Sequence, residues 1–263
     1  MDWSLLLLRV ALALYALGCV AAYLPFSLGR LRLMRLTPWL TGAGGVAHSG
    51  ALVALGLRLD RCPLGTLPEV LSFLAWTAVW VYLGVFWRYR LEVLHLIIPP
   101  LILVVLFVSG LLPEELLPVA DPYRATLLLR FHITVIVLGV AALFITFAAS
   151  LVYVLVDRAL KAKRPGAPFV RWPSLERCDR IGRLSLLWAF PLLTLGIITG
   201  ALVSVSRVGT FWSWNQRETL AVLAWIILGA VLLARLGWGW RGRKAAILTI
   251  VGFAAVFLRM LGY

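Results

Sequence analysis

Three histidines are the side chains in this sequence best suited to chemistry, and all lie inside or at the edge of apolar stretches. His132 lies about five residues into its stretch, His48 near the middle of another, and His95 just before Pro99-Pro100. Ionisable side chains within membrane spans are costly and by default indicate function. Imidazole is a common axial ligand of haem iron, whereas the structural alternative is a histidine hydrogen-bonded to a neighbouring helix. We predict iron ligation for His132 and, as a second site, for His48; for His95 the structural alternative is favoured.

The second chemical feature is a segment that places three aromatic residues in four positions, followed by polar groups. Its residues that could contact a ligand are Arg207, Gly209, Phe211, Trp212, Trp214, Asn215, Arg217 and Glu218. Flat indole faces in a shallow position can stack on a large planar apolar ligand, and the two arginines could bind its carboxylates through ionic hydrogen bonds. The alternative is an aromatic belt at the membrane interface. Glu218 also has a structural alternative in the first turn of the next span, where the helix dipole favours it.

Composition places these residues in a membrane protein. The chain has 263 residues, of which 62% are hydrophobic and 14% charged, and its mean hydropathy is +0.98. A water-soluble domain carries about 25% charged residues, so soluble classes are excluded, and the chain is far too apolar for disorder. The net charge of +14 is therefore a topology signal first, and we expect no nucleic-acid partner. The three cysteines, Cys19, Cys62 and Cys178, have neither disulfide-framework nor zinc-site spacing.

Eight apolar stretches are long enough to cross a hydrocarbon core of about 30 Å, which needs roughly 20 residues per helix. They cover about 3–24, 38–57, 68–87, 91–112, 127–156, 184–206, 218–237 and 244–262. The alternating pattern of a membrane barrel is absent, so helices must satisfy the backbone in lipid. The sequence predicts an all-α integral membrane protein, a bundle of about eight transmembrane helices in a single polytopic domain over 1–263. Proline lacks the amide donor, so Pro99-Pro100 and Pro191 should bend or break their spans.

The distribution of basic residues predicts the orientation. Counted by loop, 17 Lys and Arg lie on one side and 7 on the other, and the largest group lies in the loop 157–183. The positive-inside rule then places both termini outside and the basic loops in the cytoplasm. Segments 58–68, 112–127 and 203–218 become external, which brings His132 and the Trp-rich segment to the outer face. The basic loop is explained by topology and attraction to anionic lipid headgroups; docking of a soluble partner is the alternative.

The second half of the sequence resembles the cytochrome c assembly family, the CcsA/CcmC superfamily of haem-handling membrane proteins. The resemblance rests on GTFWSWNQRET at 209–219, on GWRGRKAA at 239–246, and on His132 at the opening of a span that ends in a basic loop. The family's WWD motif has the form WGxxWxWDxxE, and the matching residues are Gly209, Trp212, Trp214 and Glu218. The resemblance is clearest over 127–263, and the size and layout look most like short HemX/YpjD-type members.

The chain departs from the family pattern at several positions. Val208 replaces the first Trp of the motif and Asn215 replaces its Asp, which removes a charge but keeps a hydrogen-bonding group. Near the position of a further family His stand Leu233 and Ala234, and no His follows the final span. The resemblance implies that histidines bind the iron. Because only His132 is expected on the outer face, two external histidines are not available as ligands within this chain. His48 resembles an early-span His of this branch.

The resemblance implies a haem-binding protein of the cytoplasmic (inner) membrane of a prokaryote, not an enzyme. It would present non-covalent, b-type haem on the external Trp-rich loop, with membrane lipid and cytochrome c maturation proteins as partners. The alternative is a HemX-like regulator of glutamyl-tRNA reductase, a cytosolic haem-synthesis enzyme, acting through the basic loop 157–183; the missing histidines favour it. A third hypothesis is a transporter without haem, but the sequence offers few polar residues that could line a path through the helix bundle.

Overall fold

The computed structural model describes residues 2–28, 31–112, 127–162, 173–211 and 216–261, without the side chains of 26, 31, 207–208, 216–217 and 258–261. Eight α-helices and no strand occur within these residues. The helices are α1 (Trp3–Ser27), α2 (Thr37–Leu59), α3 (Leu67–Tyr89), α4 (Ile98–Leu111), α5 (Leu127–Lys161), α6 (Leu175–Val208), α7 (Gln216–Gly237) and α8 (Arg243–Leu261). Two 3-10 helices, η1 (Leu31–Leu36) and η2 (Glu92–Leu96), precede α2 and α4.

Seven helical stretches within the described ranges are long and apolar enough to cross a membrane, by length and composition. They comprise α1, α2 with η1, α3, α4 with η2, α5, α6 and α7. The predicted class, an all-α membrane protein, is confirmed. The eighth predicted span forms a helix, α8, which is not among these seven. The placement of the termini outside the cell stays a prediction.

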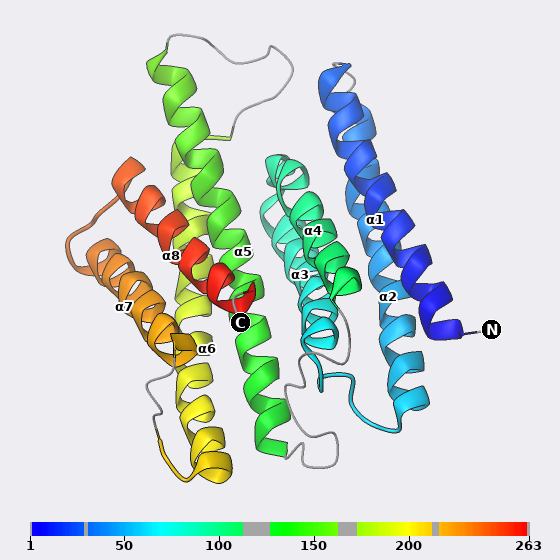
Figure 1. Ribbon diagram of the computed structural model, residues 1–263. Coiled ribbons are helices and arrows are strands. Elements are labelled where there is room, and N and C mark those ends of the chain that lie inside the picture. The colour runs from blue at the N-terminus through cyan, green and yellow to red at the C-terminus, as the bar shows by residue number, and fades with distance from the viewer. Residues whose placement is uncertain (1, 29–30, 113–126, 163–172, 212–215, 262–263) are drawn as a thin grey trace. The chain divides into compact units, whose positions relative to one another are not determined.

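The helices form two compact units, and each is described by itself (Figure 1). In the first unit α1 lies along α2, α3 lies along α4, α2 contacts α3, and α1 contacts α4. In the second unit the long helices α5 and α6 pack along each other, α7 packs against α6 and α8, and α8 returns to α5. The single-domain expectation stays a prediction.

Prolines act differently in the two spans where a bend or break was expected. Pro99 and Pro100 follow a break after η2 and occupy the first turn of α4, where their missing amide donors cost nothing. The helix α6 continues through Pro191 without interruption. The prediction of a break is therefore confirmed in span four, whereas in span six the helix stays continuous.

The helices α5 and α6 are longer than their apolar stretches. They contain 35 and 34 residues, which at about 1.5 Å per residue is roughly 50 Å each. The loop predicted over 157–183 is therefore wrong in its bounds, because α5 runs to Lys161 and α6 begins at Leu175. The Ser174 hydroxyl accepts the backbone N–H of Arg177 at 3.2 Å and caps α6. Polar residues continue both helices because backbone hydrogen bonding does not require an apolar surrounding.

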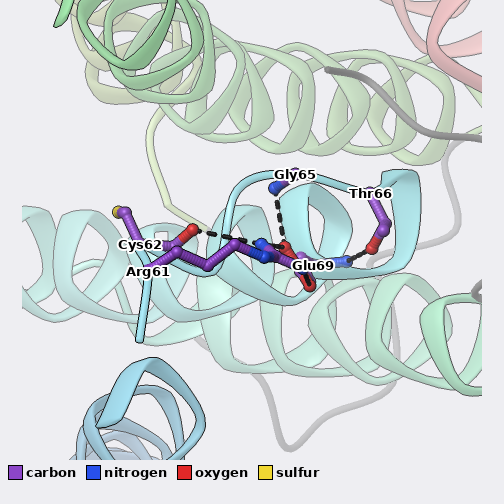
Figure 2. A network of polar contacts seen from close by, with 5 residues as sticks. All are labelled: Arg61, Cys62, Gly65, Thr66 and Glu69. Atoms are coloured by element: carbon purple, nitrogen blue, oxygen red, sulfur yellow. Dashed lines mark hydrogen bonds and ion pairs between the residues drawn. The ribbon is translucent and has the colours of Figure 1, made fainter. Parts of the chain in front are cut away.

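A polar network closes the connection between α2 and α3 (Figure 2). Arg61 donates to both carboxylate oxygens of Glu69, at 2.7 and 2.8 Å, and the backbone N–H of Gly65 donates to the same carboxylate at 2.6 Å. The hydroxyl of Thr66 accepts the N–H of Glu69 and caps α3. The side chains of Arg61 and Glu69 are only 18% and 10% exposed. The bidentate ion pair between Arg61 and Glu69 is therefore shielded from solvent and helps to fix this segment.

Cys62 gives an experimental test of the predicted orientation. It is exposed between α2 and α3, whereas Cys178 in α6 is buried. Because segment 58–68 is predicted to be external, a membrane-impermeant maleimide should label Cys62 in intact spheroplasts, and Cys62→Ser should remove the label. Labelling that occurs only after permeabilisation would reverse the assigned orientation.

Candidate functional site

His132 is positioned by the pair of long helices in the second unit. It is the sixth residue of α5 and is half-buried. Its Nδ1 atom lies 3.0 Å from the hydroxyl oxygen of Thr199 in α6. Thr199 is 7% exposed, so this hydrogen bond lies inside the helix pair rather than in solvent. The interaction fixes the imidazole against α6.

The partners of Thr199 bear on which nitrogen of His132 carries the proton. The Thr199 hydroxyl has one hydrogen, and the carbonyl oxygens of Leu195 and Gly196 lie within its reach at 2.7 and 3.2 Å. When that hydrogen goes to Leu195, the hydroxyl oxygen meets Nδ1 with a lone pair, and Nδ1 is then the donor. In this tautomer Nε2 carries the lone pair, the form in which imidazole binds a metal.

Glycines of α6 bring the two helices close enough for this contact. A Cβ atom on Gly200 would lie 2.8 Å from Cε1 of His132, and one on Gly196 would lie 2.6 Å from Cγ1 of Ile136. On α5, a Cβ on Gly139 would lie 3.1 Å from the side chain of Leu193. Small residues spaced by four positions let membrane helices approach closely. The ring of His132 therefore occupies space that only glycine leaves open.

The Trp-rich segment begins where α6 ends. Gly209 terminates α6 in the left-handed conformation, with φ of 77°, a conformation that glycine adopts without steric cost. Phe211 is 66% exposed, and Glu218 is half-buried in the first turn of α7. Trp212, Trp214 and Asn215 lie outside the described residues, as do the side chains of Arg207 and Arg217. Nine residues of helix separate Gly200 from Gly209, about 13 Å, so His132 and the start of the segment occupy one end of the second unit.

His48 lies in the first unit with both ring nitrogens hydrogen-bonded. Its Nδ1 is 3.2 Å from the hydroxyl of Tyr15, and its Nε2 is 2.9 Å from that of Ser72. The residue is fully buried and joins α1, α2 and α3. Iron ligation by His48 would require one of these bonds to break, and it remains a prediction.

His95 follows the structural alternative that its sequence position favoured. Its Nδ1 is 2.5 Å from the hydroxyl of Tyr82, and its ring lies 4.4 Å from that of Phe86, measured between centroids. It is 1% exposed. His95 therefore packs η2 against α3.

Sequence reasoning missed Thr199 and Gly200, which hold and accommodate His132. A signal was present, because residues 196–200 read GIITG, the small-xxx-small pattern of closely packed membrane helices. The partners of His48, Tyr15 and Ser72, had no comparable signal, since their pairing depends on how three helices are placed relative to one another.

Replacing Gly200 by alanine should displace the His132 ring. Overpacking of this kind costs about 1–3 kcal/mol, so we expect a lower free energy of unfolding, measured by chemical denaturation in detergent. Gly237→Ala is the matched control, because a Cβ there meets nothing within 4 Å. Equal stability of the two variants would contradict the close contact between Gly200 and His132.

Comparison with known proteins identifies relatives along most of the chain. A family model described as "Cytochrome C assembly protein" matches residues 64–263. A cytochrome c biogenesis protein CcsA of Chlamydomonas reinhardtii is 32% identical over 83% of this chain and 63% of its own length. The CcsA of Prochlorococcus marinus strain MIT 9301 is 31% identical over 76% of this chain and 72% of its own length.

One solved structure supports the fold. The cytochrome c heme lyase CcmF superposes on 99% of this chain with a TM-score of 0.73 at 19% identity, and the match covers 47% of CcmF. The chain thus spans about half of that structure and less than two thirds of the Chlamydomonas relative. None of these names is that of a HemX-like regulator, so the comparisons do not support that alternative.

Proposed function

Since the chain belongs to the cytochrome c assembly protein family, we propose that it binds haem and presents it to partners that mature c-type cytochromes. One observation carries this proposal, the hydrogen bond between His132 and Thr199. With the Thr199 hydroxyl donating to Leu195, Nδ1 donates to Thr199 and Nε2 keeps its lone pair. The contact fixes the ring near the start of α5, at the end of the second unit where α6 leads into the Trp-rich segment. A metal-binding histidine typically donates its second ring N–H to a fixed acceptor, and the Thr199 hydroxyl oxygen can serve as that acceptor here.

The residues present fit a haem group. We assign the iron to Nε2 of His132 and the planar face of the porphyrin to Phe211, Trp212 and Trp214, whose rings offer apolar stacking surfaces. Arg207 and Arg217 supply guanidinium groups for the propionates. Gly209, Asn215 and Glu218 shape the segment that carries these side chains. His48 remains a second candidate ligand.

Haem supplies the iron porphyrin that a cytochrome needs, and this chain holds it non-covalently, as b-type haem, without making or breaking its bonds. The chain acts in the cytoplasmic membrane of a prokaryote. Its partners are cytochrome c maturation proteins at the outer face. Exposure of Phe211 at the start of the segment is compatible with a ligand that is handed on rather than enclosed.

The absorption spectrum of the purified protein tests this function. We expect a Soret band that the Trp212→Ala/Trp214→Ala variant loses. The matched control is Trp238→Ala/Trp240→Ala, because these tryptophans are 78% and 43% exposed in the connection between α7 and α8. Cells without the protein should also lose c-type cytochromes in haem-stained gels. Normal c-type cytochromes with altered levels of haem precursors would instead support a regulator of tetrapyrrole synthesis.

A further inference from the structure

The second unit contains a cavity of about 260 Å³ where α6 and α8 begin, at the opposite end of α5 and α6 from His132. Its lining combines residues of α5, α6 and the α7–α8 connection. They are Tyr153, Leu175, Glu176, Asp179, Arg180, Arg183, Arg241 and Gly242. Two of these residues belong to the GWRGRKAA run, which the proposed haem site does not use.

The turn before α8 is built to bring Arg241 to this cavity. Gly242 has φ of 89°, a conformation that side-chain-bearing residues rarely adopt. A Cβ atom there would lie 3.2 Å from the hydroxyl oxygen of Tyr153. Glycine therefore allows the backbone beside Arg241 to contact α5.

The charged residues that line the cavity carry a net positive charge. The carboxylate of Asp179 is paired with Arg235, which does not line the cavity and whose Nη1 lies 3.4 Å from Oδ1 of Asp179. Arg235 is 5% exposed, and its Nε and Nη1 have no hydrogen-bond partner within the described structure. The lining also contains three arginines and one other carboxylate, that of Glu176. The site thus keeps an excess of two positive charges.

The side chains of the three lining arginines have no partner within the described part of the chain. None of the described residues forms a hydrogen bond or an ion pair with the guanidinium of Arg180, Arg183 or Arg241. Arg180 and Arg241 are exposed at the mouth, and Arg183 is half-buried. Guanidinium groups around one cavity suit a phosphate, because each planar guanidinium can donate two hydrogen bonds to its oxygens.

We propose that this cavity binds a phosphate group, as an anionic lipid headgroup or as a soluble phosphate. Its volume is below the range of about 300–1,000 Å³ that drug-sized ligands occupy, so it fits a phosphate with a small attached group. A general basic surface would attract anionic lipid without a defined partner. The cavity differs from such a surface because it binds one phosphate group through three specific arginines.

Retention of phosphatidylglycerol tests the site. The full chain is reconstituted in nanodiscs of phosphatidylcholine with and without phosphatidylglycerol, extracted in neutral detergent, and its bound lipid is counted by native mass spectrometry. The variant R180Q/R183Q/R241Q should retain at least about tenfold less phosphatidylglycerol, because a hydrogen bond to a charged group contributes more than the free energy of one decade in affinity. Replacing the same three arginines by lysine should restore part of the retention.

The control removes the same number of charges outside the cavity. R158Q/R243Q/K244Q changes exposed residues of α5 and α8 that do not line it, and we expect retention within about twofold of the unmodified chain. Titration with inorganic phosphate or glycerol 3-phosphate separates the two sources. If these ions alone raise the thermal midpoint of the unmodified chain but not of R180Q/R183Q/R241Q, the ligand is soluble. Equal loss in both triple variants, or no loss in either, would overturn the proposal.

Discussion

Replacing His132 by alanine is expected to remove most of the haem that copurifies with the protein. The substitution removes the proposed iron ligand, whereas Thr199 and the helix pair that positions it remain. We expect the haem-to-protein ratio to fall at least about tenfold, because loss of a metal ligand costs more than loss of a supporting residue, which already costs about 10–100-fold. The ratio is measured from the Soret band after purification in detergent.

His95→Gln is the matched control for this experiment. His95 is also a histidine within an apolar stretch, but it is hydrogen-bonded to Tyr82 and belongs to the first unit. Its replacement should leave the haem ratio unchanged. Thr199→Val provides a positioning readout, because it removes the hydroxyl that is hydrogen-bonded to Nδ1 without removing the ligand, and should shift the Soret maximum. An unchanged haem ratio in His132→Ala would remove His132 from the site.

Replacing Glu69 by glutamine is expected to lower the free energy of unfolding by about 3 kcal/mol. The change removes the carboxylate that accepts from Arg61 and from the N–H of Gly65 and takes one counter-charge away from a shielded guanidinium (Figure 2). Breaking one partner of a buried pair typically costs about 3–5 kcal/mol, and the remaining exposure of this pair places the estimate at the lower end. Chemical denaturation in detergent measures the effect.

Asp157→Asn is the reference for an exposed pair. It breaks the contact between Asp157 and Lys161, in which the lysine is 64% exposed, and should cost about 0.5 kcal/mol or less. If Glu69→Gln has no larger effect than Asp157→Asn, the network between α2 and α3 does not stabilise the protein.

Local features of the sequence predicted the helices well. Apolar length alone placed one stretch on each of the eight described helices, since a chain in lipid has to satisfy its backbone locally. The errors lie at polar helix ends, as at Lys161 and Leu175, where hydropathy falls before helical hydrogen bonding does. The Thr66-x-x-Glu69 pattern could have predicted the cap of α3, but the role of Arg61 depends on the turn that brings it back to Glu69.

The candidate site was only partly predictable, because its contacts join separate helices. The depth of His132 in its span predicted that it lies at one end of a helix. Its pairing with Thr199 depends on the register of two antiparallel helices, and only the glycines at 196 and 200 indicated where those helices approach. The type and spacing of the aromatic residues in the segment predicted a surface that stacks on a planar ligand, and this function remains a proposal.

The lengths of α5 and α6 set the distance between the proposed haem ligand and the arginine cavity. His132 and Tyr153 are separated by 21 residues of α5, and Gly200 and Asp179 by 21 residues of α6, so each helix spans about 32 Å between the two sites. A hydrocarbon core is about 30 Å thick. The ligand of the proposed haem site and the arginine cavity therefore lie about one membrane thickness apart along this helix pair. A bilayer much thicker than this distance would bury one of the two sites in hydrocarbon, and a much thinner one would leave one of them in water. Membrane thickness should therefore change how much ligand each site binds.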